Sequence, residues 1–198
     1  MIDWEEWYSK EDPWSIKRDK YALKRAQEMK KLVVEKIKTN GLKLSFDGGC
    51  GEGFISNLVF EDIDIKFIGL DISRKALKRA RKLKIYQDVV LGDISSLLFK
   101  DEIFDFVLLS ESIYYVKDWK RCLDEAKRIL KSEGYILISV ALGRKYLGYW
   151  EITREFKKRF SILDKRIVGT SRIRTLAKIL FFHPHYAKYL IFGRKVIR

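Results

Sequence analysis

Along the chain, short continuous apolar runs alternate with longer segments in which apolar residues recur every three to four positions. The short runs predict β-strands over residues 42–46, 66–70, 89–91, 104–109, 135–141, 161–168 and 188–195. The longer segments predict helices over residues 19–38, 53–61, 74–83, 119–130, 148–160 and 172–180. Strands that alternate with helices are typical of a mostly parallel sheet covered on both faces. The pattern therefore predicts an α/β fold.

The N-terminal forty residues differ from the rest. Residues 1–16 hold four large aromatic side chains, and five acidic residues against one lysine give them a net charge of −4. The helix that follows carries an apolar stripe made of Tyr21, Leu23, Ala26, Met29, Val33, Val34 and Ile37. We therefore divide the chain into an N-terminal arm and lid helix (residues 1–40) and a single domain (residues 41–198). A disordered tail, or an arm packed on the sheet edge, is the alternative to a lid.

Charge and composition narrow the class of protein. The 198 residues carry a net charge of +14, and residues 144–198 contribute fifteen Lys and Arg against three acids. This basic third favours an anionic partner or a solvated surface. The sequence has no apolar run near the roughly 20 residues of a membrane span and no secretory pattern at its start, so we expect a cytoplasmic protein without integral membrane association. Few Asn and Gln residues beside abundant Lys, Arg, Glu and Ile hint at a thermophile.

A glycine-rich segment, Asp47-Gly48-Gly49-Cys50-Gly51-Glu52-Gly53, follows the first predicted strand and opens a helix. Its G-x-G-x-G spacing differs from the dinucleotide fingerprint G-x-G-x-x-G, whose third glycine would fall on Phe54. The acids Asp47 and Glu52 disfavour a pyrophosphate but suit the sulfonium and ammonium of S-adenosylmethionine (SAM). We therefore predict a SAM loop made of Asp47, Gly49, Cys50, Gly51 and Gly53.

Two further acids follow the next two predicted strands. Asp71 lies 18 residues after Gly53, near the interval at which an acid meets ribose hydroxyls. Asp93 is placed to accept a hydrogen bond from the adenine amino group, with Ile94 against the ring. The alternatives are a helix-start acid for Asp71 and an ordinary turn for Asp93. The carboxyl ends of parallel strands form one edge, where open α/β sheets bind ligands.

On the glycine motif, Asp71, Asp93 and the segment 104–111, the chain resembles the class I SAM-dependent methyltransferases over residues 42–141. Gly48 departs from the family pattern, which has a branched apolar residue there. The resemblance implies a Rossmann-like three-layer α/β/α sandwich with strand order 3-2-1-4-5-7-6 and the last strand antiparallel. It also implies SAM as the cofactor, S-adenosylhomocysteine (SAH) as its product, and Ile72 and Ser110 as further cofactor-binding residues.

Two short segments resemble a narrower branch. Asp12-Pro13-Trp14 with Tyr21 and Lys24, and residues 110–115, are similar to the nodulation-protein-S-like methyltransferases. The named member of that branch N-methylates a chitooligosaccharide amine. This resemblance implies an acceptor site near Trp14 and Tyr21.

Catalytic candidates follow the fourth predicted strand. Glu111 is placed as a general base, which is needed only if the nucleophile arrives protonated. Tyr114 and Tyr115 are placed to orient an acceptor or to shield the sulfonium by cation–π contact. A helix-start acid and local aromatic packing are the alternatives.

Basic residues fall on the loops expected at the same edge. Beside Trp14 and Tyr21, the predicted acceptor-binding residues are Arg144, Arg172, His183 and His185. They favour an anionic or polyhydroxylated acceptor, although the histidines also suit surface or packing roles. No metal site is expected, because Cys50 and Cys122 lie far apart and the histidines lack partners at ligand spacing.

These observations favour a methyltransferase that acts on an N or O atom of a small-molecule acceptor such as a sugar or glycan. RNA methylation is the alternative that the basic C-terminal third favours. A catalytically silent SAM-binding scaffold is an alternative of another class. Residues 172–182 could also form a basic amphipathic helix at a membrane surface, although packing on the domain is the commoner role of such a helix.

Overall fold

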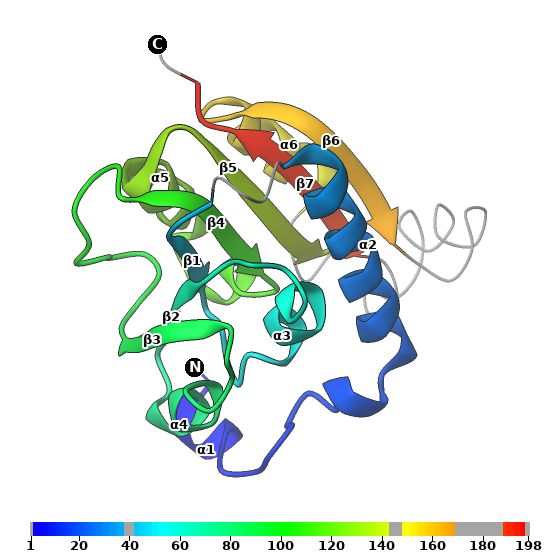
Figure 1. Ribbon diagram of the computed structural model, residues 1–198, viewed down its shortest axis with the longest axis vertical. Helices are drawn as coiled ribbons and strands as arrows, with labels where there is room; N and C mark the ends of the chain where they lie inside the picture. The colour runs from blue at the N-terminus through cyan, green and yellow to red at the C-terminus, as the bar shows by residue number, and fades with distance from the viewer. Residues whose placement is uncertain (1, 38–41, 143–147, 169–187, 197–198) are drawn as a thin grey trace.

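The computed structural model describes residues 2–37, 42–142, 148–168 and 188–196, and these form one seven-stranded sheet (Figure 1). The strands are β1 (Ser45–Gly48), β2 (Phe67–Asp71), β3 (Tyr86–Leu91), β4 (Phe104–Ser110), β5 (Leu130–Ala141), β6 (Ser161–Val168) and β7 (Lys188–Arg194). Their order is β3-β2-β1-β4-β5-β7-β6, and β7 runs antiparallel to both of its neighbours. The predicted fold class, strand order and antiparallel last strand are confirmed.

Helices cover both faces of this sheet. They are α1 (Trp4–Trp7), α2 (Lys20–Lys36), α3 (Phe54–Phe60), α4 (Arg74–Ala80), α5 (Trp119–Ile129) and α6 (Tyr149–Lys157), with 3₁₀ turns η1 (Ile16–Arg18) and η3 (Ile113–Tyr115). Helices α2, α3 and α4 pack on one face, and α5 and α6 pack on the other. The helix predicted over residues 172–180 lies outside the described residues.

The central strand β4 shows how the layers are joined. Phe106 and Leu108 join the core under α2, α3 and α4, whereas Val107 and Leu109 join the core under α5 and α6. All four side chains are buried. Each buried side chain of this size contributes roughly 1.5–3 kcal/mol relative to an exposed one. Two packed faces therefore hold the strand ends, and the loops that leave them, in fixed positions.

The buried face of α2 differs from the predicted stripe. Leu23 and Val34, both placed in that stripe, are 40% and 59% exposed. The side chains that do face the core are Ala22, Arg25, Ala26, Met29, Leu32 and Val33. This set follows the three-to-four residue helical repeat more strictly than the predicted one. Consequently an arginine, Arg25, lies on the buried face.

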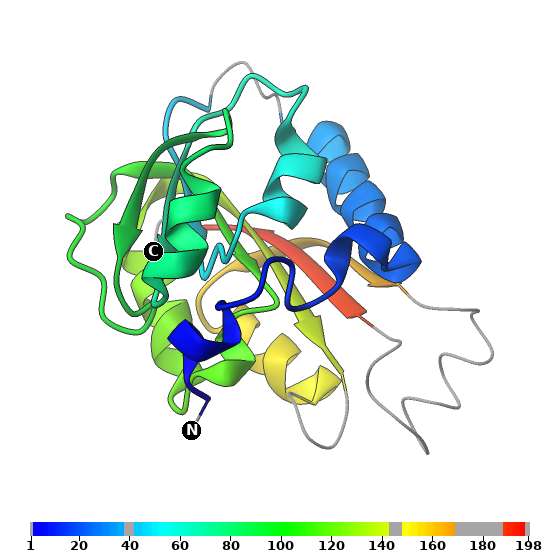
Figure 2. The same cartoon turned by 90° about the horizontal axis from the view of Figure 1, so that it is seen from below.

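The N-terminal arm crosses the edge at which β1, β2 and β4 end (Figure 2). Its short helix α1 contacts α4, and its second half leads into α2 (Figure 2). Within the described ranges, no helix is long and apolar enough to cross a membrane.

Candidate active site at the carboxyl ends of the strands

The glycine loop turns sharply at the end of β1. Gly49, Gly51 and Gly53 have φ values of +72°, +54° and +78°, a region that side-chain-bearing residues rarely adopt. The N–H groups of Gly49 and Cys50 both donate to the Leu70 carbonyl, at 2.7 and 2.9 Å, and so tie the loop to β2. A Cβ atom at Gly49 would lie 2.4 Å from Ser112 Cβ. The loop therefore forms a backbone cradle that side chains would fill.

Gly48, where the chain departs from the family pattern, has a packing explanation. A Cβ atom there would lie 2.6 Å from Leu109 Cδ2 and 2.9 Å from Phe46 Cε1. The volume that a branched residue would take is occupied by these two neighbours. The strand end keeps its position with a glycine.

Asp47 lies buried beneath the loop. Its Oδ2 atom accepts hydrogen bonds from Ser56 Oγ at 2.5 Å and from Tyr86 Oη at 2.6 Å. Burial raises the pKa of Asp47 to about 6, although both hydrogen bonds act to lower it. Cys50 sits above in the loop with its Sγ 3.6 Å from the Gly51 carbonyl, and burial raises the pKa of its thiol.

Asp71 joins the glycine loop to the start of α4. Its Oδ2 accepts from the Gly51 N–H at 2.8 Å, and its Oδ1 accepts from the Ser73 N–H at 2.9 Å. Burial raises the pKa of Asp71 as well, because backbone hydrogen bonds offset only part of the desolvation. Ile72, the next residue, is apolar and 52% exposed. A buried acid beside a bare apolar side chain fits a ribose and an adjoining ring.

Asp93 and Ile94 lie at the end of β3. The carboxylate of Asp93 is exposed, and its Oδ1 accepts from both the N–H and the hydroxyl of Ser95 at 2.7 Å. This contact is that of an ordinary Asx turn. Ile94 is buried in the core together with Phe46 and Leu109. Their predicted roles toward adenine stay predictions.

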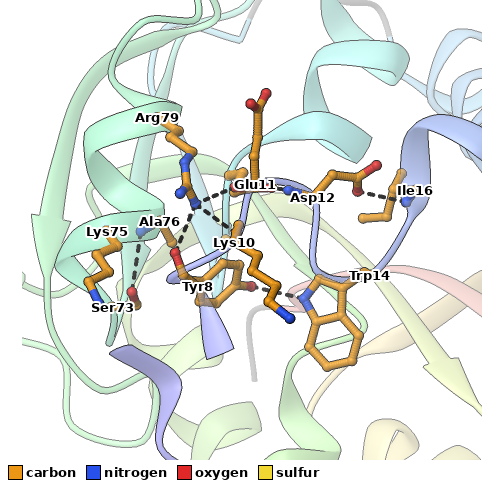
Figure 3. Close-up of polar contacts among 12 residues, drawn as sticks. Tyr8, Lys10, Glu11, Asp12, Trp14, Ile16, Ser73, Lys75, Ala76 and Arg79 are labelled. Atoms are coloured by element: carbon orange, nitrogen blue, oxygen red, sulfur yellow. Dashed lines mark hydrogen bonds and ion pairs between the residues drawn. The ribbon is translucent and has the colours of Figure 1, made fainter. Parts of the chain in front are cut away.

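The arm is fastened to the cofactor loops by charged contacts. Glu5 accepts from the Arg74 N–H at 2.5 Å and from Ser73 Oγ at 3.2 Å. Arg79 of α4 donates to the carbonyls of Tyr8 and Lys10 at 3.0 and 3.2 Å (Figure 3).

The same guanidinium links the arm to the glycine loop. Arg79 Nη1 lies 2.6 Å from Glu52 Oε1, and the Asp12 N–H donates to Glu52 Oε2 at 2.9 Å. Tyr8 Oη would lie 2.7 Å from a Cβ atom at Gly51. Together Arg79, Glu52, Tyr8 and Asp12 form what we call the arm latch.

Aromatic rings of the arm meet Tyr115 above the end of β4. Trp4 and Trp14 lie with ring centroids 5.2 and 5.7 Å from that of Tyr115, and Tyr114 lies 4.6 Å from it. Trp14 Nε1 donates to Tyr8 Oη at 3.1 Å. The structure thus brings Trp14, Tyr114 and Tyr115, all predicted from the sequence, into one cluster.

Glu111 has a different environment from the other acids. Its Oε1 accepts from Ser139 Oγ at 2.6 Å, and its Oε2 accepts from Tyr114 Oη at 2.8 Å. Lys188 Nζ also donates to Oε2, and Arg25 Nη1 lies 3.6 Å from Oε1.

These contacts change the chemistry expected of Glu111. Burial would raise its pKa, but Arg25, Lys188 and the hydrogen bonds lower it to about 2. A carboxylate with such a low pKa is a weak proton acceptor near neutral pH. Its backbone φ is +57°, a conformation that costs on the order of 1–3 kcal/mol for a non-glycine residue and is concentrated at functional sites.

The sequence did not predict several residues of the site, and some of the predicted residues lie outside the described ranges. No sequence motif marks the residues that surround Glu111, which are Arg25, Ser139 and Lys188. For Arg25, the available signal was a cation on the buried face of α2. Tyr21 is the second residue of α2, and its N–H donates to Asp19 Oδ1. Arg144, Arg172, His183 and His185 lie outside the described residues.

Arg25, which contacts Glu111, and Ser110, which precedes it, each have a buried side-chain atom without a hydrogen-bond partner. Among the described residues, the unsatisfied buried side-chain atoms are Arg25 Nε, Ser45 Oγ and Ser110 Oγ. Ser110, predicted to bind the cofactor, immediately precedes Glu111. Among the residues that the structure describes, no group of three or more His, Cys, Asp or Glu residues is arranged to hold a metal ion.

Comparison with known families identifies the domain. Residues 46–138 match the family model described as a methyltransferase domain. Residues 46–138 form a methyltransferase domain, on a sheet with the class I strand order. The methyltransferase match confirms the family predicted from the glycine motif, and with it SAM as the cofactor. The positive-φ glycine cradle and the buried Asp71 fit that cofactor.

Two curated relatives and one solved structure resemble this methyltransferase domain. Arginine-hydroxylase NDUFAF5 of Homo sapiens is 36% identical over 94 residues, which are 48% of this chain and 27% of that protein. The uncharacterized protein MJ0638 of Methanocaldococcus jannaschii is 35% identical over 141 residues, which are 70% of this chain and 59% of that protein. The chain therefore spans from about a quarter to three fifths of the length of these relatives.

The solved structure is the N-methyltransferase NodS from Bradyrhizobium japonicum in complex with SAH. It superposes with a TM-score of 0.78 at 14% identity, and covers 96% of this chain and 95% of its own. The nodulation-protein-S-like resemblance is confirmed at the level of the fold.

Proposed function

We propose that this protein is a SAM-dependent methyltransferase that transfers a methyl group to an N or O atom of a small-molecule acceptor. Asp71 carries the proposal, because it ties the glycine cradle to α4 and sits beside the exposed Ile72. In this account Asp71 receives the ribose hydroxyls and Ile72 lies against the adenine. Asp93 and Ser110 complete the cofactor site, with Asp47 placed below the loop near the cationic part of the cofactor.

The state of Glu111 limits the acceptor chemistry. When bound, SAM supplies an activated methyl group and its own leaving group, so positioning and exclusion of water can supply much of the catalysis. Glu111 is held as a carboxylate by two cations and two hydroxyls, so we assign it a positioning role and not that of a base. The acceptor atom is then one that is already unprotonated, such as the nitrogen of a free amine.

We propose that the arm is a lid over the cofactor, with α2 as its support. The latch supports this role, since Arg79 and Glu52 join the arm to both cofactor loops. The aromatic cluster of Trp4, Trp14 and Tyr115 would then cover the methyl position and orient the acceptor.

Replacement of Arg79 by Met tests the lid. We expect roughly tenfold weaker SAH binding, equal to about 1.4 kcal/mol, because the arm no longer holds the closed position. Arg81→Met is the matched control. It changes an exposed arginine that directly follows α4 and pairs with Asp88 of β3. Equal SAH affinity in both variants, measured by calorimetry, would argue against a lid.

The acceptor is best sought among sugars and glycans with a free amine, which suit the aromatic cluster, the nodulation-protein-S-like fold and the unprotonated nucleophile. The predicted acceptor-binding residues Trp14, Tyr21, Arg144, Arg172, His183 and His185 would then face it. RNA is the second candidate, since the net charge of +14 favours a polyanion.

Transfer of a radiolabelled methyl group from SAM to an amino-sugar panel, and separately to tRNA and rRNA, tests the choice. Label on amino sugars supports the proposal, and label on RNA replaces it with the second candidate. SAM binding without transfer to any acceptor of either class would favour a silent SAM-binding scaffold.

A further inference from the structure

A buried charge cluster beside the proposed methyl position carries more positive than negative charge. Arg25 from α2 and Lys188 from the start of β7 both contact the carboxylate of Glu111, which follows β4. The side chains of Arg25, Glu111 and Lys188 are only 7%, 14% and 22% exposed. Two cations and one carboxylate leave this half-enclosed group with a surplus of one positive charge.

The carboxylate of Glu111 leaves Arg25 without a hydrogen bond. Glu111 accepts on Oε1 from Ser139 and on Oε2 from Tyr114 and Lys188. Arg25 contacts it only through a 3.6 Å ion pair from Nη1. The Nε atom of Arg25 is buried and has no hydrogen-bond partner. A buried guanidinium with an unused donor is unfavourable unless a further group binds it.

The cluster lies at the ligand edge of the sheet. Lys188 pairs with Ala141, the last residue of β5, and Glu111 follows the last residue of β4. The unsatisfied Ser110 hydroxyl adjoins Glu111. The ends of β4, β5 and β7 thus meet at the ligand edge, where Arg25 of α2 contacts Glu111 and Ser110 precedes it in the chain.

We propose that Arg25 binds an oxyanionic group of the acceptor, a carboxylate or a phosphate, with Lys188 as a second cation. The guanidinium fork matches the geometry of such groups, and this pairing is stronger than a neutral hydrogen bond. Glu111 acts as the positioning residue that holds both cations in the site. The inference rests on the proposed methyltransferase function and specifies its acceptor: an amine that also bears an acid group.

Nuclear magnetic resonance of the arginine Nε–Hε groups tests this without a known acceptor. The SAH complex is titrated with sodium acetate, with inorganic phosphate and with sodium chloride at matched ionic strength. We expect the Arg25 Nε–Hε signal to shift saturably with acetate or phosphate and not with chloride. The stronger of the two responses identifies the acid group as a carboxylate or a phosphate.

Two arginine variants serve as controls. Arg25→Lys removes the Arg25 signal itself, so its anion binding is followed by calorimetry and should weaken at least about tenfold, because a point charge replaces the fork. Arg166→Lys alters an arginine that also pairs with carboxylates of α2, Glu28 and Glu35, and not with Glu111, and should leave the titration unchanged.

Different results would contradict the oxyanion site and the methyltransferase function. Calorimetry on the same samples first establishes that SAH binds. If SAH binds and the Arg25 signal responds to acetate and phosphate no more than to chloride, the oxyanion site is wrong while the methyltransferase proposal stands. If folded protein does not bind SAH, the proposed function itself fails. The wild-type titration decides alone should Arg25→Lys not fold.

Discussion

The acids at the strand ends of β1 and β2 and the acid at the end of β4 have opposite surroundings. Asp47 and Asp71 are contacted by hydroxyls and backbone N–H groups, and burial raises the pKa of each. Glu111 is contacted by Arg25 and Lys188, which lower its pKa to about 2. In the cofactor half of the edge Asp47 and Asp71 therefore lack a cation, whereas in the acceptor half Glu111 has two.

This difference separates the two ligands by charge. Carboxyl groups that lack a cation favour a positively charged ligand, which SAM is. A cluster with surplus positive charge favours a negatively charged one. The edge thus has a polarity that would orient a cationic donor and an anionic acceptor toward one another.

Glu111→Gln removes the negative charge from the acceptor half of the edge and has the largest expected effect on the free energy of unfolding. Without the negative charge, Arg25 and Lys188 stay buried beside each other, and the free energy of unfolding should fall by about 3–5 kcal/mol at pH 7. Because the folded-state pKa lies below the unfolded value, this contribution is present above about pH 4.5 and is lost as pH falls toward 2. Urea unfolding at pH 7 and pH 3 measures it.

Glu102→Gln is the matched control for that variant. Glu102 also has a positive φ, of +55°, and also pairs with a lysine, Lys195, but its side chain is exposed. Exposed pairs of this kind stabilise little. A loss of stability as small for Glu111→Gln as for Glu102→Gln would contradict the difference between the two halves.

Asp47→Asn sharpens the cofactor half through its pH dependence. The folded-state pKa of Asp47, about 6, lies above the ordinary value of 3.8, so its contribution to stability is fully present below about pH 4 and is lost as pH rises through 6. Between pH 4 and 7 the wild type should lose up to about 3 kcal/mol relative to Asp47→Asn. If urea unfolding gives the wild type and Asp47→Asn the same pH dependence of the free energy of unfolding across this range, the raised pKa of Asp47 would be contradicted.

Ile72→Ala has the smallest expected effect. The side chain is half exposed, so the free energy of unfolding should hardly change, while SAH binding should weaken about fivefold through lost contact with adenine. Leu163→Ala, which changes another partly exposed apolar side chain, on β6, should leave calorimetric SAH affinity unchanged. Unchanged SAH affinity in Ile72→Ala would contradict the proposed placement of adenine against Ile72 at the end of β2.

The sequence was informative where the pattern is local. Buried strands such as β4 read as apolar runs, and the glycine loop combines special backbone conformations with a position between strand and helix. Strand ends were less predictable: β3 begins at Tyr86, earlier than expected, because the polar pair Gln87-Asp88 hides its first half. The arm helix α1 is only four residues long and has no apolar period to detect.

The charge cluster shows what local pattern cannot supply. Glu111 was found because it follows a strand, but its pKa is set by Arg25 and Lys188, which come from opposite ends of the chain. Only the sheet order brings β7 next to β5 and so places Lys188 beside Glu111. Our proposal of a positioning role for Glu111, in place of the general base predicted from the sequence, rests on these contacts.

The most direct test of the central claim is calorimetric titration of SAM and SAH into the wild type and Asp71→Ala, with circular dichroism to establish that both are folded. The account predicts binding in roughly the micromolar range for the wild type and a loss of at least about a hundredfold in the variant. Failure of the folded wild type to bind either compound would contradict it, as would equal affinity in Asp71→Ala.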